Sequence, residues 1–178
     1  SDQDSLNMKK MEPLTGEELE QKILSQDDER LFAVYESMKR GMTVERLHEL
    51  TGIDEWFLNK LLHLLTLERR MQGELFTEEL HMEAKQYGFP DRVIKEMTGL
   101  TELKHIPACY RMVDTCSAEF AASTPYFYSS YGEEDEAGPF IMEHAVGKQV
   151  VMVFGSGPIR IGQGIEFDYA SVHCVWSL

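Results

Sequence analysis

A glycine-rich loop at residues 155–169 comes nearest, in residue types and spacing, to a motif that could bind a nucleotide. It reads GSGPIRIGQGIEFDY, follows the apolar run at 150–154 and precedes a helix-like segment that extends to Leu178. Glycines let the backbone approach a ligand closely and open conformations that a side chain forbids. A buried strand, a glycine-rich turn and a helix, in that order, predict the opening of a parallel α/β unit.

Two nucleotide-binding motifs can be compared with this loop, and neither fits. The dinucleotide fingerprint G-x-G-x-x-G requires glycine at its sixth position, where this chain has Arg160. A phosphate-binding loop read from Gly157 puts Gln163 in place of the lysine that reaches the phosphates. It also puts Gly164 in place of the hydroxyl that reaches magnesium. We therefore expect no nucleotide site in this loop.

Composition narrows the class of protein. The 178 residues carry a formal charge of −14, which repels nucleic acid phosphates and anionic membrane surfaces, and 43% hydrophobic residues suffice for a core. No apolar run approaches the roughly 18 residues of a membrane span. Cys109, Cys116 and Cys174 form no C-x-x-C pair, which favours free thiols in a reducing, cytoplasmic setting and no metal site. We expect neither nucleic acid nor membrane as a partner.

Capping residues and glycine stops divide the first part of the chain into short helices. Residues 1–13 are polar and aperiodic, and they predict a disordered leader. Residues 14–106 predict at least six helices joined by tight turns, which describes a compact all-α bundle. The predicted starts are Thr15, Asp27, Thr43, Asp54, Thr77 and Pro90, and the predicted stops include Gly41, Gly52, Gly88 and Gly99.

The helix that begins at Asp54 is the longest of these and is apolar on more than half of its circumference. Such a helix lies in the middle of a bundle or at a subunit contact. Its candidate core or contact residues are Trp56, Phe57, Leu61, Leu64 and Leu65. The region 42–65 also resembles a helix-turn-helix, but its second helix begins with acids and carries leucines instead of the basic residues that DNA requires.

Beyond residue 106 the helical period disappears. Residues 107–147 predict an extended segment rich in docked aromatic side chains, followed by a linker with an acidic surface loop at 133–136. Residues 148–178 predict the truncated opening of the α/β unit. The fold class is therefore mainly α, with one truncated strand-loop-helix at the end.

Isolated ionisable residues have structural explanations. His48, His63 and His81 have no second ligand one helical turn away, so we expect packed or hydrogen-bonded histidines. Asp114 and Glu119 stand among apolar residues, and we expect partly buried acids paired with an arginine. Acids at 166 and 168 suit the start of a helix whatever the function.

Three strings in the chain resemble one family. GSGPIRIGQGIEFDYASVH resembles the glycine-rich segment that opens the second synthetase half of the carbamoyl phosphate synthase large subunit. YRMVDTCSAEFAASTPYFYSSY is similar to the extended stretch before that half, and RGMTVERLHELTGIDEWFLNKL to the helical oligomerisation domain between the halves. The resemblance implies an oligomerisation domain at 14–106 and the start of a pre-ATP-grasp domain at 148–178.

The resemblance also implies a function for the parent enzyme. In that family the large subunit makes carbamoyl phosphate, for arginine and pyrimidine synthesis, from bicarbonate, ammonia and two ATP. Its cofactors are ATP and magnesium or manganese, with potassium, and none of their sites falls in this segment. Its partners are a small glutaminase subunit, which releases ammonia from glutamine, and other copies of the large subunit. We expect this segment to link the two halves, to mediate oligomerisation and to be inactive alone.

By the same resemblance, one stretch of the glycine-rich loop borders the tunnel that carries carbamate between the two active sites. The implied tunnel residues are Glu166, Arg160, Gly162, Gln163 and Gly164. A reactive intermediate needs an enclosed path that excludes water. The alternative function is a stand-alone interaction or regulatory module without catalysis.

Overall fold

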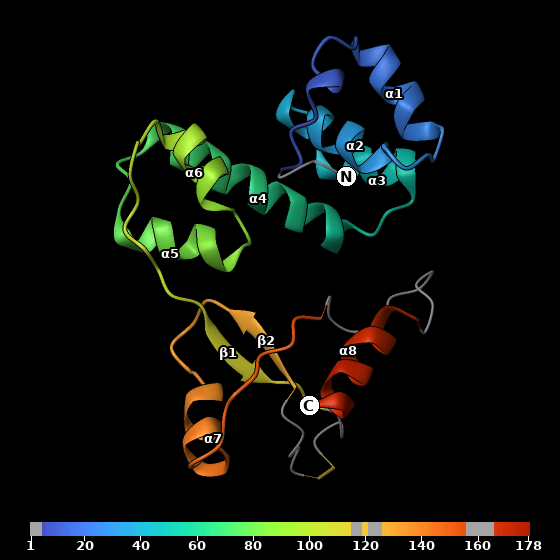
Figure 1. The fold of residues 1–178 in the computed structure, drawn as a ribbon. Helices are drawn as coiled ribbons and strands as arrows, with labels where there is room; N and C mark the ends of the chain where they lie inside the picture. The colour runs from blue at the N-terminus through green and yellow to red at the C-terminus, as the bar shows by residue number, and fades with distance from the viewer. Residues whose placement is uncertain (1–4, 115–118, 121–125, 156–165) are drawn as a thin grey trace. The chain divides into compact units, whose positions relative to one another are not determined.

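The structure, a computed structural model, describes residues 5–114, 119–120, 126–155 and 166–178, and of residues 166–168 and 170 it describes the backbone alone. The chain divides into two compact units, Ser1–Ile106 and Pro107–Leu178. Helices make up most of the first unit, and the second holds two helices and the one small sheet among the described residues (Figure 1). The predicted mainly α fold is confirmed.

The first unit is a succession of short helices around one long one. In order they are η1 (Lys9–Met11), α1 (Gly16–Leu24), α2 (Arg30–Lys39), α3 (Val44–Thr51), α4 (Glu55–Gly73), α5 (Glu78–Gln86) and α6 (Asp91–Thr98). The first of these is a single 3₁₀ turn, and the others are α-helices.

Most helix starts and stops follow the predicted caps, but α2 begins at Arg30 instead of Asp27 and has no side-chain cap. Thr15 and Glu18 form a reciprocal capping box at the start of α1. The side chains of Thr43, Asp54 and Thr77 accept backbone hydrogen bonds at the starts of α3, α4 and α5. Gly52 and Gly99 end α3 and α6 in the left-handed conformation, which glycine adopts without a steric penalty.

Two hydrophobic cores lie along α4. The first contains buried residues from α1, α2, α3 and the N-terminal part of α4, and the second joins the C-terminal part of α4 to α5 and α6. Figure 1 shows α4 passing from the first group of helices to the second. Leu64 packs against both cores, so α4 is the element that joins them.

The described part of the leader, residues 5–13, is ordered, in contrast to the disordered segment that we expected at 1–13. Met11 is buried, and Leu6 and Met8 pack against the first core. The polar composition of these residues hid three apolar side chains whose burial offsets the entropy of ordering the segment.

The second unit is built on a two-stranded antiparallel sheet. Strands β1 (Cys109–Met112) and β2 (Phe127–Ser130) pair in a register that sets Cys109 opposite Ser130. Helix α7 (Ala137–His144) packs against β1, and α8 (Glu166–Ser177) lies at the C-terminal end.

Two predictions for this unit need correction. The segment expected to be extended does contain two strands, but the linker at 137–147 contains helix α7. Residues 150–154 form no strand in the described part of the chain. A strand needs a neighbour for its backbone hydrogen bonds, and no described segment pairs with this run.

Candidate functional site

Helix α4 presents two different surfaces along its length. Leu65 is 3% exposed in the first core, and Leu61 and Leu64 are partly buried against it. Trp56 and Phe57, in the first turn, are 60% and 59% exposed. The five residues predicted as one core or contact set therefore divide into three that pack inside the unit and two that face outward.

The exposed pair forms a small aromatic platform. The rings of Trp56 and Phe57 meet edge to face, with centroids 4.9 Å apart and planes at 88°. The Lys60 ammonium lies 5.0 Å from the centre of the Trp56 ring, within cation–π range. Two large aromatic side chains exposed side by side are typical of a surface that another protein covers.

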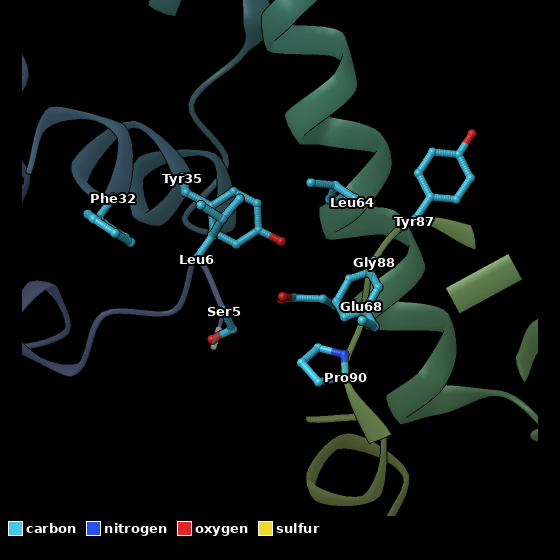
Figure 2. Close-up of a pocket in the computed structure, with 10 residues that line it drawn as sticks. Ser5, Leu6, Phe32, Tyr35, Leu64, Glu68, Tyr87, Gly88 and Pro90 are labelled. Carbon is cyan, nitrogen blue, oxygen red and sulfur yellow. The ribbon is translucent and has the colours of Figure 1, made fainter. Parts of the chain in front are cut away.

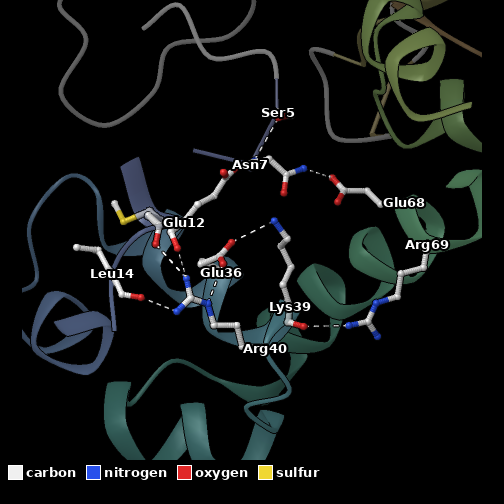
Figure 3. Close-up of polar contacts among 10 residues, drawn as sticks. Ser5, Asn7, Glu12, Leu14, Glu36, Lys39, Arg40, Glu68 and Arg69 are labelled. Carbon is white, nitrogen blue, oxygen red and sulfur yellow. Dashed lines mark hydrogen bonds and ion pairs between the residues drawn. The ribbon is translucent and has the colours of Figure 1, made fainter. Parts of the chain in front are cut away.

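A polar network ties the leader to α2 (Figure 3). Arg40 donates hydrogen bonds to the carbonyls of Leu14, Met11 and Glu12 over 2.6, 3.2 and 2.9 Å, and its Nε donates to the Glu36 carboxylate. Burial of Glu36 opposes ionisation, but hydrogen bonds and charges from Arg40 and Lys39 outweigh it and lower the pKa of that carboxyl. One arginine side chain thus donates to three backbone carbonyls at the end of η1 and between η1 and α1.

A cavity of about 300 Å³ opens between the leader, α2, α4 and the turn before α6 (Figure 2). Its walls are mainly apolar and aromatic, and Glu68 is its one acid. Glu68 is 4% exposed and Tyr35 is fully buried, and the Tyr35 hydroxyl points toward the Glu68 carboxylate. The lining residues are Ser5, Leu6, Phe32, Tyr35, Leu64, Glu68, Tyr87, Gly88, Phe89 and Pro90.

The polar atoms at this cavity are incompletely satisfied. Asn7 Nδ2 donates to Glu68 Oε1 over 2.9 Å. Among the described residues, the buried Tyr35 hydroxyl and Asn7 Oδ1 have no hydrogen-bond partner. Although the hydroxyl faces Glu68, its geometry falls short of a hydrogen bond. Burial raises the pKa of Glu68, and burial with the nearby Glu68 charge raises the pKa of Tyr35 well above its usual range.

His48, His63 and His81 occupy packed or hydrogen-bonded positions, as we expected. His48 Nδ1 lies 2.7 Å from the Ile53 carbonyl, and the ring of His63 lies 4.4 Å from that of Tyr87. His81 is buried, which lowers its pKa. Within the described ranges, no three histidine, cysteine, aspartate or glutamate side chains gather as a metal site.

Arg111 pairs with acids of the run 133–136. Its guanidinium is 3.0 Å from Glu134 Oε2, and its Nε is 3.9 Å from Glu136 Oε2. Asp114 and Glu119 are exposed, not partly buried as we expected, and Arg160 lies outside the described residues. Residues of the acidic run 133–136 are thus more than solvated charges, and sequence offered no signal for this long-range pairing.

Asp135 and Glu136 brace the edge of β1. They accept backbone hydrogen bonds from Tyr110 over 2.9 Å and from Met112 over 2.6 Å. These two bonds satisfy N–H groups on the side of β1 that faces away from β2. They also fix the start of α7 beside the sheet.

The implied tunnel residues are mostly beyond what the structure describes. Arg160, Gly162, Gln163 and Gly164 lie outside the described residues. Glu166 is the first residue of α8, and only its backbone is described. Their role as tunnel residues stays a prediction.

No helix among the described residues combines the length and the apolar character that crossing a membrane requires. The longest, α4, spans 19 residues and carries charged side chains along its length.

Comparison with known proteins identifies the class of the helical unit. Residues 1–110 match the family described as carbamoyl-phosphate synthetase large chain, oligomerisation domain. Residues 147–178 match the carbamoyl phosphate synthase preATP-grasp domain. The first unit is therefore an oligomerisation-type helical domain, and a piece of a pre-ATP-grasp domain follows it.

Curated relatives agree with both matches. The chain is 45% identical over 182 residues to the carbamoyl phosphate synthase large chain of Agathobacter rectalis, covering 98% of this chain and 17% of that protein. It is 42% identical over 183 residues to the large chain of Clostridium acetobutylicum, covering 97% of this chain and 17% of that one. The chain belongs to the carbamoyl phosphate synthase large-chain family, as its sequence predicted, and spans about one-sixth of the relatives' length.

Proposed function

We propose that this chain serves as the connecting and self-associating segment of a carbamoyl phosphate synthase large chain. The observation that carries the proposal is the order of the two family matches, an oligomerisation domain followed directly by the start of a pre-ATP-grasp domain. A segment in that order lies between two synthetase halves. Its own work is architectural.

The parent enzyme, on this proposal, is an ATP-dependent ligase. It makes carbamoyl phosphate from bicarbonate, ammonia and two ATP, with magnesium or manganese and potassium, and a small glutaminase subunit supplies the ammonia from glutamine. The product serves arginine and pyrimidine synthesis in the cytoplasm. Nucleic acid is not a partner, because the chain carries a charge of −14. Alone, the segment makes no carbamoyl phosphate.

Self-association, in this proposal, uses the exposed aromatic pair of α4. Trp56 and Phe57 are large, rigid and adjacent, and aromatic side chains are enriched at the centres of protein interfaces. Leu65 and its buried neighbours hold the helix in place. The partner is a second copy of the same segment, as the name of the matched domain supports.

Glu166, Arg160, Gly162, Gln163 and Gly164 would border the carbamate tunnel of the full enzyme. Glycines with one or two polar side chains suit the wall of an enclosed path that excludes water. Glu166→Gln in a full-length large chain should leave each half-reaction intact and reduce the fraction of carbamate converted to product. If the variant converts the same fraction of carbamate to product as wild type, Glu166 is not a tunnel residue.

A domain exchange tests the proposal as a whole. The matched segment of the Agathobacter rectalis large chain is replaced by these 178 residues, and glutamine-dependent carbamoyl phosphate synthesis is measured. The proposal predicts an active, assembled chimera, while the isolated segment has no activity. A chimera that folds and assembles but makes no carbamoyl phosphate would favour the stand-alone interaction module.

A further inference from the structure

The cavity beside Glu68 carries an unbalanced charge. Among the described residues, no lysine, arginine or histidine nitrogen lies within 4.0 Å of the Glu68 carboxylate. The nearest cation that lowers its pKa is Lys39, whose Nζ is 3.1 Å from Glu36 instead. A buried carboxylate normally has a cationic partner, so this one can accept a cation that the described residues do not supply.

The acceptors around the cavity are arranged for a donor with several N–H groups. Glu68, the Tyr35 oxygen and Asn7 Oδ1 come from α4, α2 and the leader, and the last two accept no hydrogen bond from a described residue. An ammonium group has three donors and no acceptor, which matches three oxygen acceptors. An anion would meet only repulsion from Glu68, and a neutral hydroxyl would leave its charge unpaired.

The remaining walls suit the body of a small organic cation. Phe32 and Phe89 supply aromatic side chains to the cavity wall, and Leu64 and Pro90 complete its apolar surface. Aromatic faces attract ammonium groups, and a cavity of about 300 Å³ lies at the small end of ligand pockets. We propose that this cavity binds a small molecule that carries a primary ammonium group on an apolar body, with Glu68 as its counter-ion.

Proton linkage gives this site a recognisable signature. Burial raises the pKa of Glu68 in the empty cavity, and a bound ammonium group would lower it. The other charged or titratable groups that act on this pair are Tyr35 and Lys39 of α2 and, through Tyr35, Arg69 of α4. Tyr35 stays protonated, and Lys39 stays paired with Glu36. Binding should therefore weaken as the pH falls through the pKa of Glu68, and release a proton near that pKa.

The test uses the full 178-residue chain and a pair of matched probes. Binding of 2-phenylethylammonium and of neutral 2-phenylethanol is followed by NMR chemical shifts of residues around the cavity. We expect saturable binding of the amine that is at least ~10-fold tighter than that of the alcohol, the effect of a single well-placed charge contact. This comparison needs no variant and so does not depend on whether a mutant folds.

Two isosteric variants and a control locate the contact. Glu68→Gln keeps the shape and the bond from Asn7 and should remove most of the preference for the amine, while Tyr35→Phe should reduce it. Glu55→Gln removes the same charge from an exposed site on the same helix and should leave the preference unchanged. No saturable amine binding, equal binding of both probes, or an undiminished preference in a folded Glu68→Gln variant would overturn the proposal.

Discussion

Arg40 lies one turn along α2 from Glu36, and its Nε donates a hydrogen bond to Glu36 Oε1 over 2.9 Å. The rest of the guanidinium binds three carbonyls of the leader. This pair is therefore the point at which the leader, whose composition predicted disorder, becomes part of the first core.

Replacing Arg40 tests that role. Arg40→Ala should lower the free energy of unfolding by about 1–3 kcal/mol, since it removes one of the two cationic partners of the buried Glu36 carboxylate and the side-chain donor of three carbonyls. Arg46→Ala is the control, because Arg46 and its partner Glu49 are both largely exposed, and it should cost less than about 0.5 kcal/mol. Urea unfolding measures both. Equal small effects would show that the leader packs without Arg40.

Glu36 and Glu68 should affect stability with opposite dependence on pH. The lowered pKa of Glu36 means that its stabilisation is present above the ordinary value of 4.5 and is lost as the pH falls through its folded pKa. The raised pKa of Glu68 means that its favourable contribution exists below 4.5 and is lost as the pH rises through its folded pKa.

At pH 7, Glu68→Gln should therefore unfold at higher urea concentration than wild type, and Glu36→Gln at lower concentration. The Glu68→Gln difference should shrink as the pH falls through the raised pKa of Glu68 toward 4.5. The Glu36→Gln difference should shrink only as the pH falls below 4.5, through the lowered pKa of Glu36. Urea midpoints measured from pH 7 to pH 3 check the two variants side by side. The same sign of change in both variants at pH 7 would contradict the assignment.

Leu65 and Leu62 offer a matched pair on α4. Leu65 is buried in the first core, whereas Leu62 is 38% exposed. Leu65→Ala should cost about 2–5 kcal/mol because it leaves a cavity, and Leu62→Ala less than about 1 kcal/mol. Thermal unfolding measures both. The more severe Leu65→Asp should unfold the helical unit. Comparable costs for the two alanine variants would mean that α4 faces its core differently.

Gly99 and Gly16 should respond in opposite directions to the same substitution. Gly99 has a φ of +73°, so alanine there is strained and should cost about 1 kcal/mol although nothing crowds its Cβ. Gly16 begins α1 with open space around it, and Gly16→Ala should stabilise by about 0.5 kcal/mol. Differential scanning calorimetry distinguishes a gain from a loss. If Gly99→Ala left the unfolding temperature unchanged, the positive φ of Gly99 would not explain why α6 ends there.

Local signals predicted the helical unit well because each cap is a short-range interaction. Thr15, Thr43, Asp54 and Thr77 act on backbone groups two or three residues away, so the sequence contains the whole interaction. The apolar stripe of α4 could also be predicted from the sequence. Which of its apolar residues are buried and which are exposed could not be predicted, because that depends on where the neighbouring helices end.

Contacts between distant residues escaped prediction. Strands β1 and β2 are separated by a connection far longer than a hairpin turn, so no turn motif in the sequence predicts that they pair. Tyr35 and Glu68 meet across α2 and α4, and nothing in either local sequence marks them. The run at 150–154 resembles a buried strand because all of its residues are apolar. A strand also requires a neighbour for its backbone hydrogen bonds, and sequence alone does not show whether one is present.

Sedimentation velocity of the full chain tests the central claim, that the exposed aromatic pair of α4 mediates self-association. We predict that wild type and Leu75→Ser, which removes another exposed apolar side chain, sediment as oligomers over the same concentrations. The double variant Trp56→Ser, Phe57→Ser should sediment as a monomer with unchanged helical circular dichroism. A wild-type monomer at every concentration, or a double variant that stays oligomeric, would contradict the account.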